Sequence, residues 1–423
     1  MNLTERDNMV IWHPYTQMKG SESVGIVRGE GAYLFDENNK CYIDAVSSWW
    51  VNTHGHANPY IAEKISEQAL TLEHVIFAGF THPKAVELAE RLLTHLPKNQ
   101  KKIFYSDNGS TAVEVAIKMA IQFWGNRGIE KKKVIAFTNA YHGDTFGAMS
   151  VSGRSVFTDP FRTFLFEAEF IETPVQGKED SAFKQLKTLV DSHQVAAFIF
   201  EPLVQGAAGM IMYKPEPLEK MIAYCKANNV ITIADEVMTG FYRTGRFFAT
   251  NHLTVKPDIY CLSKGITGGF MAMGVTSCTQ EIFDAFLSDD KTKTLYHGHS
   301  YTANPLACAA AIASLDLYEN KNCINDVTRI QFKHKEFLNR IQNHKAVDTV
   351  RQQGTIIAIE IKTDAGTSYL NSVRDKIYTF FLQKGIILRP LGNIIYILPP
   401  YCISDNDLDF VYDSIIEFLN VTS

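Results

Sequence analysis

The chain has 423 residues, of which 46% are hydrophobic and 21% charged, and its formal net charge is −5. This composition is typical of a globular protein that is large enough for two or three domains and needs no disulfides to stabilise its core. It excludes a strongly basic nucleic-acid-binding chain and a highly charged disordered one.

Three further features of the sequence bear on where the protein is located in the cell. The first residues include Glu5, Arg6 and Asp7 and lack the apolar stretch of a signal peptide. The sequence has no run of about 18 apolar residues, so we expect no membrane-spanning helix. The seven cysteines are scattered and form no CxxC motif, which is typical of reduced thiols. We therefore expect a cytoplasmic protein that binds neither nucleic acid nor membrane and that holds no metal.

The middle of the chain alternates short apolar runs with amphipathic stretches. The apolar runs predict buried strands, and the stretches 111–123 and 216–228 predict helices. This alternation indicates an α/β domain with a mainly parallel sheet, in which ligands bind at the carboxyl ends of the strands. The predicted strands lie at residues 103–105, 134–137, 195–200, 230–234, 259–262 and 273–277.

A loop of small polar residues follows the first predicted strand and opens the 111–123 helix. It contains Gly109 and Ser110. Backbone N–H groups at a helix N-terminus bind anions, so the loop could hold a phosphate. The loop also fits an ordinary helix cap, in which Thr111 and Glu114 form a capping box. By itself it is weak evidence for a ligand.

The second and third predicted strands also end in functional side chains. Tyr141, His142 and Asp144 follow strand 134–137, and Glu201 follows strand 195–200. An aromatic ring at this place can stack on a flat cofactor, although a lone tyrosine is more often part of the core. Glu201 adds a carboxylate to the same edge of the sheet.

The next two strands end in an acid and an amine. Asp235 follows strand 230–234, and Lys264 follows strand 259–262, one crossover later along the chain. The pair could be a structural ion pair. It also fits a Schiff-base lysine with an aspartate that faces a pyridinium nitrogen. A buried lysine loses its charged form more easily, which makes it a nucleophile and a base.

After about residue 315 the chain changes to helical patterns and short strands, such as 355–361 and 394–398. We interpret this part as a smaller α+β domain that the N-terminal segment completes. The predicted organisation is a large domain at residues 50–314 and a small domain formed by residues 1–49 and 315–423.

Three segments resemble the class III aminotransferases of fold type I. They are Glu201-Pro-Leu-Val-Gln-Gly, Asp235-Glu-Val-Met-Thr-Gly-Phe-Tyr-Arg-Thr-Gly and Leu262-Ser-Lys-Gly-Ile-Thr-Gly-Gly. The resemblance extends over nearly the whole chain. It implies an α/β fold, with a large domain built on a mainly parallel sheet and a smaller α+β domain. It further implies pyridoxal 5'-phosphate as cofactor and an obligate homodimer with two active sites at its interface.

The resemblance also implies roles for individual residues. Lys264 carries the Schiff base, Asp235 pairs with the pyridine nitrogen and Tyr141 stacks on the ring. Gly109 and Ser110 hold the phosphate, which Ser300 reaches from the second subunit. The substrate-binding residues it implies are Tyr15, Trp49, Trp50, Asp144, Gly298 and Arg389. Simple core packing for one of the two tryptophans, and a surface ion pair for Arg389, remain the alternatives.

Four segments are similar to one branch of the family, which acts in biotin biosynthesis. They begin at Ile11, Ser47, Tyr141 and Arg389. This branch converts 8-amino-7-oxononanoate to 7,8-diaminononanoate, with S-adenosylmethionine as the amino donor. The segment around His299 and Ser300 resembles members that use lysine instead, so the donor remains open between these two molecules.

Three other functions remain as alternatives. The first is another class III enzyme, an ω-amino-acid or diamine:2-oxoacid transaminase. The second is an aminomutase, which shifts an amino group within one molecule on the same fold. The third is a binding protein that has kept the fold, which the intact Lys264 and Asp235 argue against.

Overall fold

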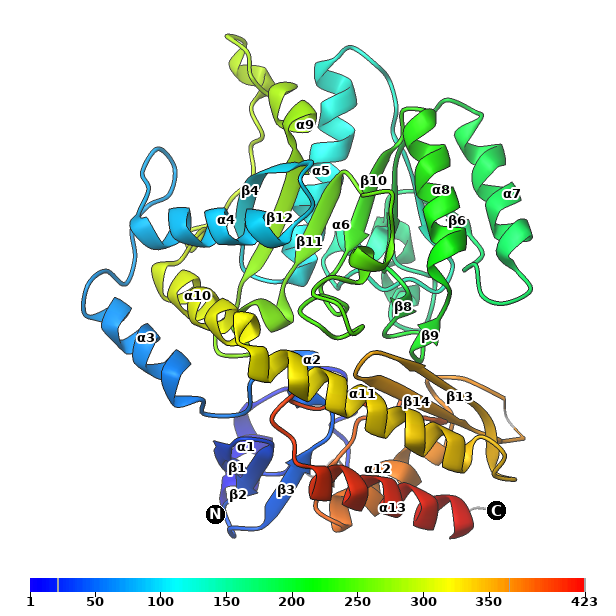
Figure 1. The fold of residues 1–423 in the computed structure, drawn as a ribbon. Coiled ribbons are helices and arrows are strands. Elements are labelled where there is room, and N and C mark those ends of the chain that lie inside the picture. The colour runs from blue at the N-terminus through cyan, green and yellow to red at the C-terminus, as the bar shows by residue number, and fades with distance from the viewer. Residues whose placement is uncertain (21–22, 365, 422–423) are drawn as a thin grey trace.

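The computed structural model describes residues 1–20, 23–364 and 366–421, and its largest element is a seven-stranded sheet within these ranges (Figure 1). The strands lie in the order β4-β12-β11-β10-β7-β5-β6. Their bounds are β4 (Gln100–Ser106), β12 (Gly274–Thr279), β11 (Ile259–Leu262), β10 (Ile231–Asp235), β7 (Val195–Phe200), β5 (Lys133–Phe137) and β6 (Glu169–Ile171).

The sheet is mainly parallel, as the sequence predicts. Strand β10 pairs in parallel with β11 and β7, and β5 pairs in parallel with β7 and β6. Strand β12 is antiparallel to both of its neighbours. All six predicted strands are present, and β6 is an additional strand of three residues at the edge. Because parallel strands end together, the residues that follow β5, β7, β10 and β11 meet at one edge of the sheet.

Helices cover both faces of this sheet and bury two separate apolar clusters. On one face α5 (Gly109–Asn126) packs against β11 and β12, and its buried side chains are nearly all apolar. The other face is covered by α4 (Pro83–His95), α7 (Glu179–Val190) and α8 (Pro215–Ala227). Helix α8 confirms the predicted 216–228 helix. The shorter helices of this part are α6 (Phe146–Ser150) and α9 (Gln280–Asp284), with η1 (Asp159–Phe164), η2 (Ala249–His252) and η4 (Lys291–Lys293).

Helix α5 begins two residues before the predicted start, and the expected capping box is wrong. The cap is Asn108, whose side chain accepts the Thr111 N–H at 2.9 Å while Thr111 Oγ1 accepts the Asn108 N–H at 3.1 Å. Glu114 lies one turn further on and instead accepts the Gly147 N–H at 2.7 Å. The local pattern predicts Glu114 in the helix cap, but Glu114 instead forms a tertiary hydrogen bond with Gly147.

The two ends of the chain lie together below the large sheet in Figure 1. They form a sheet of β1 (Ile26–Glu30), β2 (Tyr33–Asp36), β3 (Cys41–Asp44) and β15 (Ile386–Ile387). A second sheet contains β13 (Val347–Gln353), β14 (Ile356–Ile361) and β16 (Ile394–Ile397). The other elements of these segments are α1 (Leu3–Val10), α12 (Val373–Gln383) and α13 (Asp405–Val421), and the small hairpin of β8 (Val204–Gln205) and β9 (Ile211–Met212) lies above them.

The division into a large and a small domain stays a prediction, which the separate placement of these sheets supports. The predicted boundaries fall inside continuous elements. Residue 314 lies within α10 (Pro305–Glu319), which is followed at once by α11 (Lys321–Ile341). Residue 49 lies within α2 (Ser47–Trp50), and α3 (Pro59–Ala69) comes next. The C-terminal boundary therefore lies within a long helix, and the N-terminal boundary lies within a four-residue turn with a left-handed backbone.

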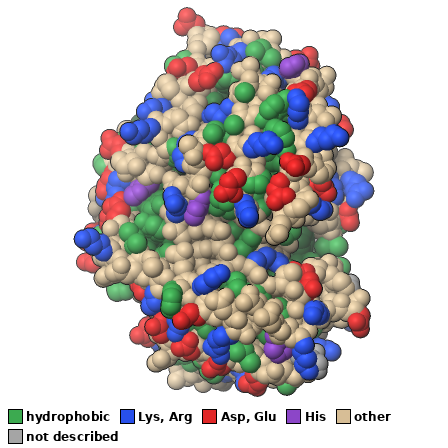
Figure 2. Space-filling view, turned by 45° about the vertical axis from the view of Figure 1, so that its right-hand side comes forward, with side chains coloured by type: hydrophobic (Ala, Val, Ile, Leu, Met, Phe, Trp, Pro, Cys, Tyr) green, Lys and Arg blue, Asp and Glu red, His purple; other side chains and the backbone are tan. Residues whose placement is uncertain are grey.

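The surface agrees with the balanced composition. Figure 2 shows basic and acidic side chains intermingled over the visible face. Across the described ranges, the helices are all too short or too polar to cross a membrane.

Candidate active site

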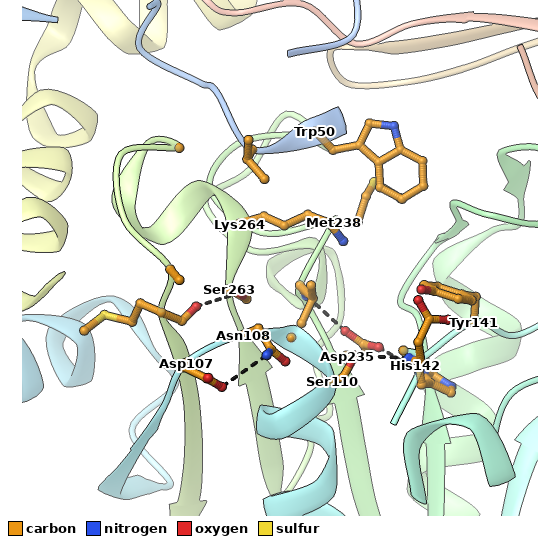
Figure 3. Close-up of a pocket in the computed structure, with 18 of the residues that line it drawn as sticks. Trp50, Asp107, Asn108, Ser110, Tyr141, His142, Asp235, Met238, Ser263 and Lys264 are labelled. Atoms are coloured by element: carbon orange, nitrogen blue, oxygen red, sulfur yellow. Dashed lines mark hydrogen bonds and ion pairs between the residues drawn. The ribbon is translucent and has the colours of Figure 1, made fainter. Parts of the chain in front are cut away.

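A pocket of about 660 Å³ lies at the carboxyl ends of the central strands (Figure 3). Each neighbouring strand contributes a side chain to it. Lys264 follows β11, Asp235 ends β10, Glu201 follows β7 and Tyr141 follows β5. The loop that caps α5 closes another side through Asn108, Gly109 and Ser110. The sheet thus brings together residues from distant parts of the sequence, as the parallel topology predicts.

Asp235 is held rigidly at the floor of this pocket. It is only 4% exposed. Its Oδ2 is 2.7 Å from His142 Nδ1, and its Oδ1 accepts the Val237 N–H at 3.1 Å. Because His142 is itself buried, the ring and the carboxylate fix each other's orientation. A fixed, buried carboxylate of this kind can keep a nearby base protonated.

Glu201 is a second buried acid next to Asp235. Its carboxylate accepts the N–H groups of Tyr141 and Gly206, both at 3.0 Å. Burial raises the pKa of Glu201 to about 7, although these hydrogen bonds act in the opposite direction. Through its bond to the Tyr141 backbone, Glu201 fixes the place at which the tyrosine enters the pocket.

Lys264 reaches into the pocket beneath Trp50, with its Nζ 5.0 Å from the centroid of the indole ring. Burial lowers the pKa of Lys264, and the nearby charges of Asp235 and Glu201 oppose that shift. The backbone of Lys264 is left-handed, with a φ of +46°. An amine that loses its proton more easily and is held in one place is suited to act as a nucleophile or a base.

The N-terminus of α5 provides a place for an anion. Gly109 and Ser110 are its first two residues and line the pocket. A side chain at position 109 would come within 2.7 Å of Val237, so glycine allows the helix to approach the floor of the pocket. With the amine, the buried carboxylate and the Tyr141 ring around one pocket, the residues fit pyridoxal phosphate.

An aromatic and polar cluster lies beside this pocket. Tyr15 Oη donates to Asp144 at 2.5 Å and is 3.1 Å from Tyr141 Oη. Since the proton of Tyr15 points to the carboxylate, Tyr141 donates the second hydrogen bond. Burial raises the pKa of both phenols. The two hydroxyls therefore remain protonated and tie the N-terminal segment to the loop after β5.

The two tryptophans have different surroundings. Trp50 is buried, lines the pocket and donates from Nε1 to Tyr396 Oη at 3.0 Å. Trp49 is 38% exposed and packs edge-on against Tyr15, with ring centroids 5.4 Å apart. The guanidinium of Arg389 lies 4.3 Å above the Trp49 ring. Trp50 thus belongs both to the hydrophobic core and to the pocket wall, whereas Trp49 is not a core residue.

The guanidinium group of Arg389 can form a further hydrogen bond. Its Nη2 is buried and has no hydrogen-bond partner within the described part of the chain. Of the ion pairs within those ranges, none includes Arg389. A buried, unpaired guanidinium nitrogen is costly unless a ligand binds it.

Tyr15, Trp49 and Arg389 do not line this pocket but lie in the cluster beside it. The structure does not bring Gly298 and Ser300 to the pocket either. Both are exposed, in a segment between β12 and α10. The sequence also gave no role to His142, which pairs with Asp235, or to Asn108, which caps α5. The Tyr-His-Gly-Asp cluster after a buried strand was the available signal for His142.

Comparison with known proteins gives consistent results. The family model described as aminotransferase class-III matches residues 16–419. A Synechococcus elongatus protein named adenosylmethionine-8-amino-7-oxononanoate aminotransferase is 45% identical over 97% of this chain and 98% of its own length. A Staphylococcus aureus protein of the same name is 35% identical, over 96% of this chain and 94% of its own length.

Solved structures agree with these sequences. The crystal structure of adenosylmethionine-8-amino-7-oxononanoate aminotransferase from Methanocaldococcus jannaschii superposes with a TM-score of 0.94. Its sequence is 37% identical, and the match covers 99% of this chain and 98% of that one. An amine transaminase from an uncultivated Pseudomonas species, solved in a PLP-bound form, has a TM-score of 0.90 at 29% identity, over 96% of this chain and 97% of that one.

Proposed function

The chain belongs to the class-III aminotransferase family, and from this premise we propose that it converts 8-amino-7-oxononanoate to 7,8-diaminononanoate in biotin biosynthesis. Pyridoxal phosphate is the proposed cofactor, and S-adenosylmethionine is the proposed amino donor. Similarity over nearly the full length to relatives named for this activity supports the substrates. The structural observation that carries the chemistry is the Lys264 amine beneath Trp50, above the buried carboxylate of Asp235.

The residues that would hold the cofactor surround one pocket. Gly109 and Ser110, at the N-terminus of α5, would take the phosphate, and Tyr141 would lie against the ring. When bound, pyridoxal phosphate supplies an electron-accepting ring and a carbonyl carbon through which the amino group passes from donor to acceptor.

Two residues move or hold protons in this proposal. Lys264 Nζ would take a proton from the amino-bearing carbon of the donor and supply one to the former carbonyl carbon of the acceptor, because burial favours its neutral form. Asp235 holds a proton at the pyridine nitrogen with its negative charge, since His142 and the Val237 N–H keep it correctly oriented.

The remaining residues select the substrate. 8-Amino-7-oxononanoate has an apolar tail that ends in a carboxylate. Trp50 lines the pocket, and the rings of Trp49 and Tyr15 in the cluster beside it would extend an aromatic wall for the tail. The free Nη2 of Arg389 provides a donor for the carboxylate. The aromatic faces also suit the sulfonium cation of S-adenosylmethionine, which favours this donor over lysine.

The direct test is incubation with 8-amino-7-oxononanoate and one candidate donor at a time, with mass detection of the diamine. We expect 7,8-diaminononanoate with S-adenosylmethionine and little with lysine. Product formation with lysine alone would overturn the choice of donor. Transfer to a 2-oxoacid without any diamine product would favour an ω-amino-acid transaminase, and amino migration without a donor would favour an aminomutase.

Replacement of Arg389 by alanine tests the carboxylate site. Arg389→Ala should weaken transition-state binding of the keto acid by about 2–5 kcal/mol, because the substrate carboxylate loses a charged partner in a partly buried site. Single-turnover absorbance changes with 8-amino-7-oxononanoate would measure the effect, and the absorbance of the resting enzyme should be unchanged.

Arg340 offers a matched control for that replacement. Its guanidinium also lies over an aromatic ring, 5.9 Å from the centroid of Phe337, but it is on α11 and pairs with Asp413. Arg340→Ala should leave the keto-acid rate unchanged. An unchanged rate in Arg389→Ala would remove Arg389 from the substrate site.

A homodimer is part of the proposal. The exposed segment that carries Gly298 and Ser300 would then reach the phosphate site of the second subunit, as the family resemblance implies. Gly298 and Ser300 are exposed in the single chain and so are accessible to a second subunit, which supports this arrangement. A cytoplasmic location, indicated by the scattered cysteines, completes the proposal.

A further inference from the structure

The turn that carries Lys264 has a backbone that an L-amino acid rarely adopts. Lys264 has a φ of +46°, in the left-handed region where a side chain meets steric resistance. Strand β11 ends at Leu262, and the short helix η3 (Lys264–Thr267) begins at the lysine itself. Surrounding contacts must therefore hold this turn in place.

Those contacts converge on the carbonyl oxygen of the residue after the lysine. Gly265 O accepts the Tyr318 hydroxyl at 2.7 Å, the Ser314 hydroxyl at 3.4 Å and the Gly268 N–H at 3.0 Å. Ser314 and Tyr318 are four residues apart on α10, so they lie on the same face of that helix. Both are fully buried.

The glycine at position 265 makes this approach possible. A Cβ at this position would lie 3.1 Å from Tyr318 Oη and 3.2 Å from a ring carbon of Phe241. The Tyr318 ring is itself fixed between Phe241, with centroids 5.3 Å apart, and His54, with centroids 4.2 Å apart. The hydroxyl therefore has little freedom to move away from the turn.

Each hydroxyl is in turn oriented by a residue of the segment that follows Trp50. Thr53 Oγ1 is 2.5 Å from Tyr318 Oη, and His54 Nε2 is 2.9 Å from Ser314 Oγ. A carbonyl can only accept, so the single protons of Tyr318 and Ser314 point to Gly265. Thr53 is then the donor to Tyr318, and His54 can donate to Ser314 from Nε2. Two parallel hydrogen-bonded chains thus run from adjacent residues to one oxygen.

The histidine has the protonation state that this arrangement needs. Burial lowers the pKa of His54 to about 3, so the ring is neutral and carries one N–H. With its proton on Nε2, the neutral ring can donate to the Ser314 oxygen at 2.9 Å.

We propose that Tyr318, with Ser314, is a positioning residue that holds the Lys264 turn by the Gly265 carbonyl and couples it to the segment 50–54. This inference rests on the proposed role of Lys264. The coupling matters because Trp50, in the same segment, covers the Lys264 amine at 5.0 Å. The two chains therefore fix the amine and the aromatic wall above it as one unit.

Tyr318→Phe removes one hydroxyl and keeps the ring. We expect the loosened turn to let the Lys264 amine become more hydrated, so its pKa rises towards the usual value. In the full chain after removal of any bound cofactor, reductive methylation of Lys264 at a fixed pH should slow about threefold, as for a shift of half a pKa unit. Peptide mass mapping measures this rate without reference to any enzymatic activity.

The same variant loaded with pyridoxal phosphate gives two further readouts. The pH at which the absorbance of the bound cofactor changes should move away from that of the wild type. With the substrates of the proposed reaction, kcat should fall about tenfold while KM changes little, because a misplaced amine slows proton transfer and not binding.

Tyr105→Phe is the matched control. Tyr105 is also buried and donates its hydroxyl to a backbone carbonyl, that of Ala85 at 2.6 Å, which is not part of the lysine turn. This variant should lose stability but keep the wild-type methylation rate and titration. Equal changes in both variants, or no change in Tyr318→Phe, would overturn the proposal.

A second pair of variants covers the case in which Tyr318→Phe does not fold. Thr53→Val removes the first donor of one chain with little change of shape, and Thr53→Ser restores the hydroxyl. Methylation of Lys264 should slow in Thr53→Val and return in Thr53→Ser. An unchanged rate in Thr53→Val would overturn the proposal. Failure of the diamine assay alone would refute the proposed substrates and leave the positioning role standing.

Discussion

Lys264→Ala should abolish turnover and the covalent attachment of pyridoxal phosphate. The amine has no replacement within reach, because the other side chains that line the described pocket include no second lysine. We expect a rate loss of about 10³-fold or more, since the variant lacks both the nucleophile and the proton-transfer group. Borohydride reduction followed by protein mass measurement should add the mass of the cofactor to the wild type and not to the variant.

A second, half-buried lysine offers the control for this result. Burial also lowers the pKa of Lys256, but its ammonium group donates to the carbonyl oxygen of Thr250 at 2.9 Å and does not line the pocket. Lys256→Ala should keep full turnover and full covalent labelling. Wild-type turnover in Lys264→Ala, or loss of labelling in Lys256→Ala, would contradict the assignment of the Schiff-base lysine.

The central sheet and its active-site edge were predictable from local sequence. Buried parallel strands are short, continuous apolar runs, and strand β11 at Ile259–Leu262 matches the predicted range without change. A parallel sheet places the ends of its strands together, so the meeting of Asp235, Lys264 and Tyr141 followed from the topology alone.

Other features depend on contacts between distant residues and were not predictable. Residues Ser47 to Trp50 form a left-handed turn with φ between +44° and +77°, which no local preference favours. The turn is held by tertiary bonds, such as that from the Ser47 hydroxyl to the Leu398 carbonyl at 2.7 Å. The direction in which Trp49 and Trp50 point therefore could not be predicted from a sequence pattern.

The same reason explains the polar groups that the sequence left without a role. His142 faces Asp235 across strands that are far apart along the chain, and Tyr318 reaches the lysine turn from α10. A lone buried histidine or tyrosine is commonly a core residue, so neither had a signal of its own. The place of Ser300 stays a prediction, because a single chain does not test a contact with a second subunit.

Asp235→Asn should leave the fold intact and slow the reaction by about 10²-fold or more, the scale for removal of one preorganised electrostatic partner. Asparagine has the same shape, and its oxygen can still accept the Val237 N–H that Asp235 accepts at 3.1 Å. Its amide can donate to His142 Nδ1 if the histidine proton moves to Nε2, which has no partner in the described part of the chain. Cofactor binding should therefore survive.

The lost property is the negative charge that keeps the pyridine nitrogen protonated, so the ring of the bound cofactor becomes a weaker electron acceptor. Single-turnover rates and the pH dependence of the cofactor absorbance would measure this loss. Asp258→Asn is the matched control, because Asp258 precedes β11 at the opposite end of the sheet and binds the Thr232 N–H at 2.9 Å. The Asp258→Asn variant should be less stable but should react at the wild-type rate. A near-normal rate in Asp235→Asn would mean that another group, such as the buried Glu201, protonates the ring.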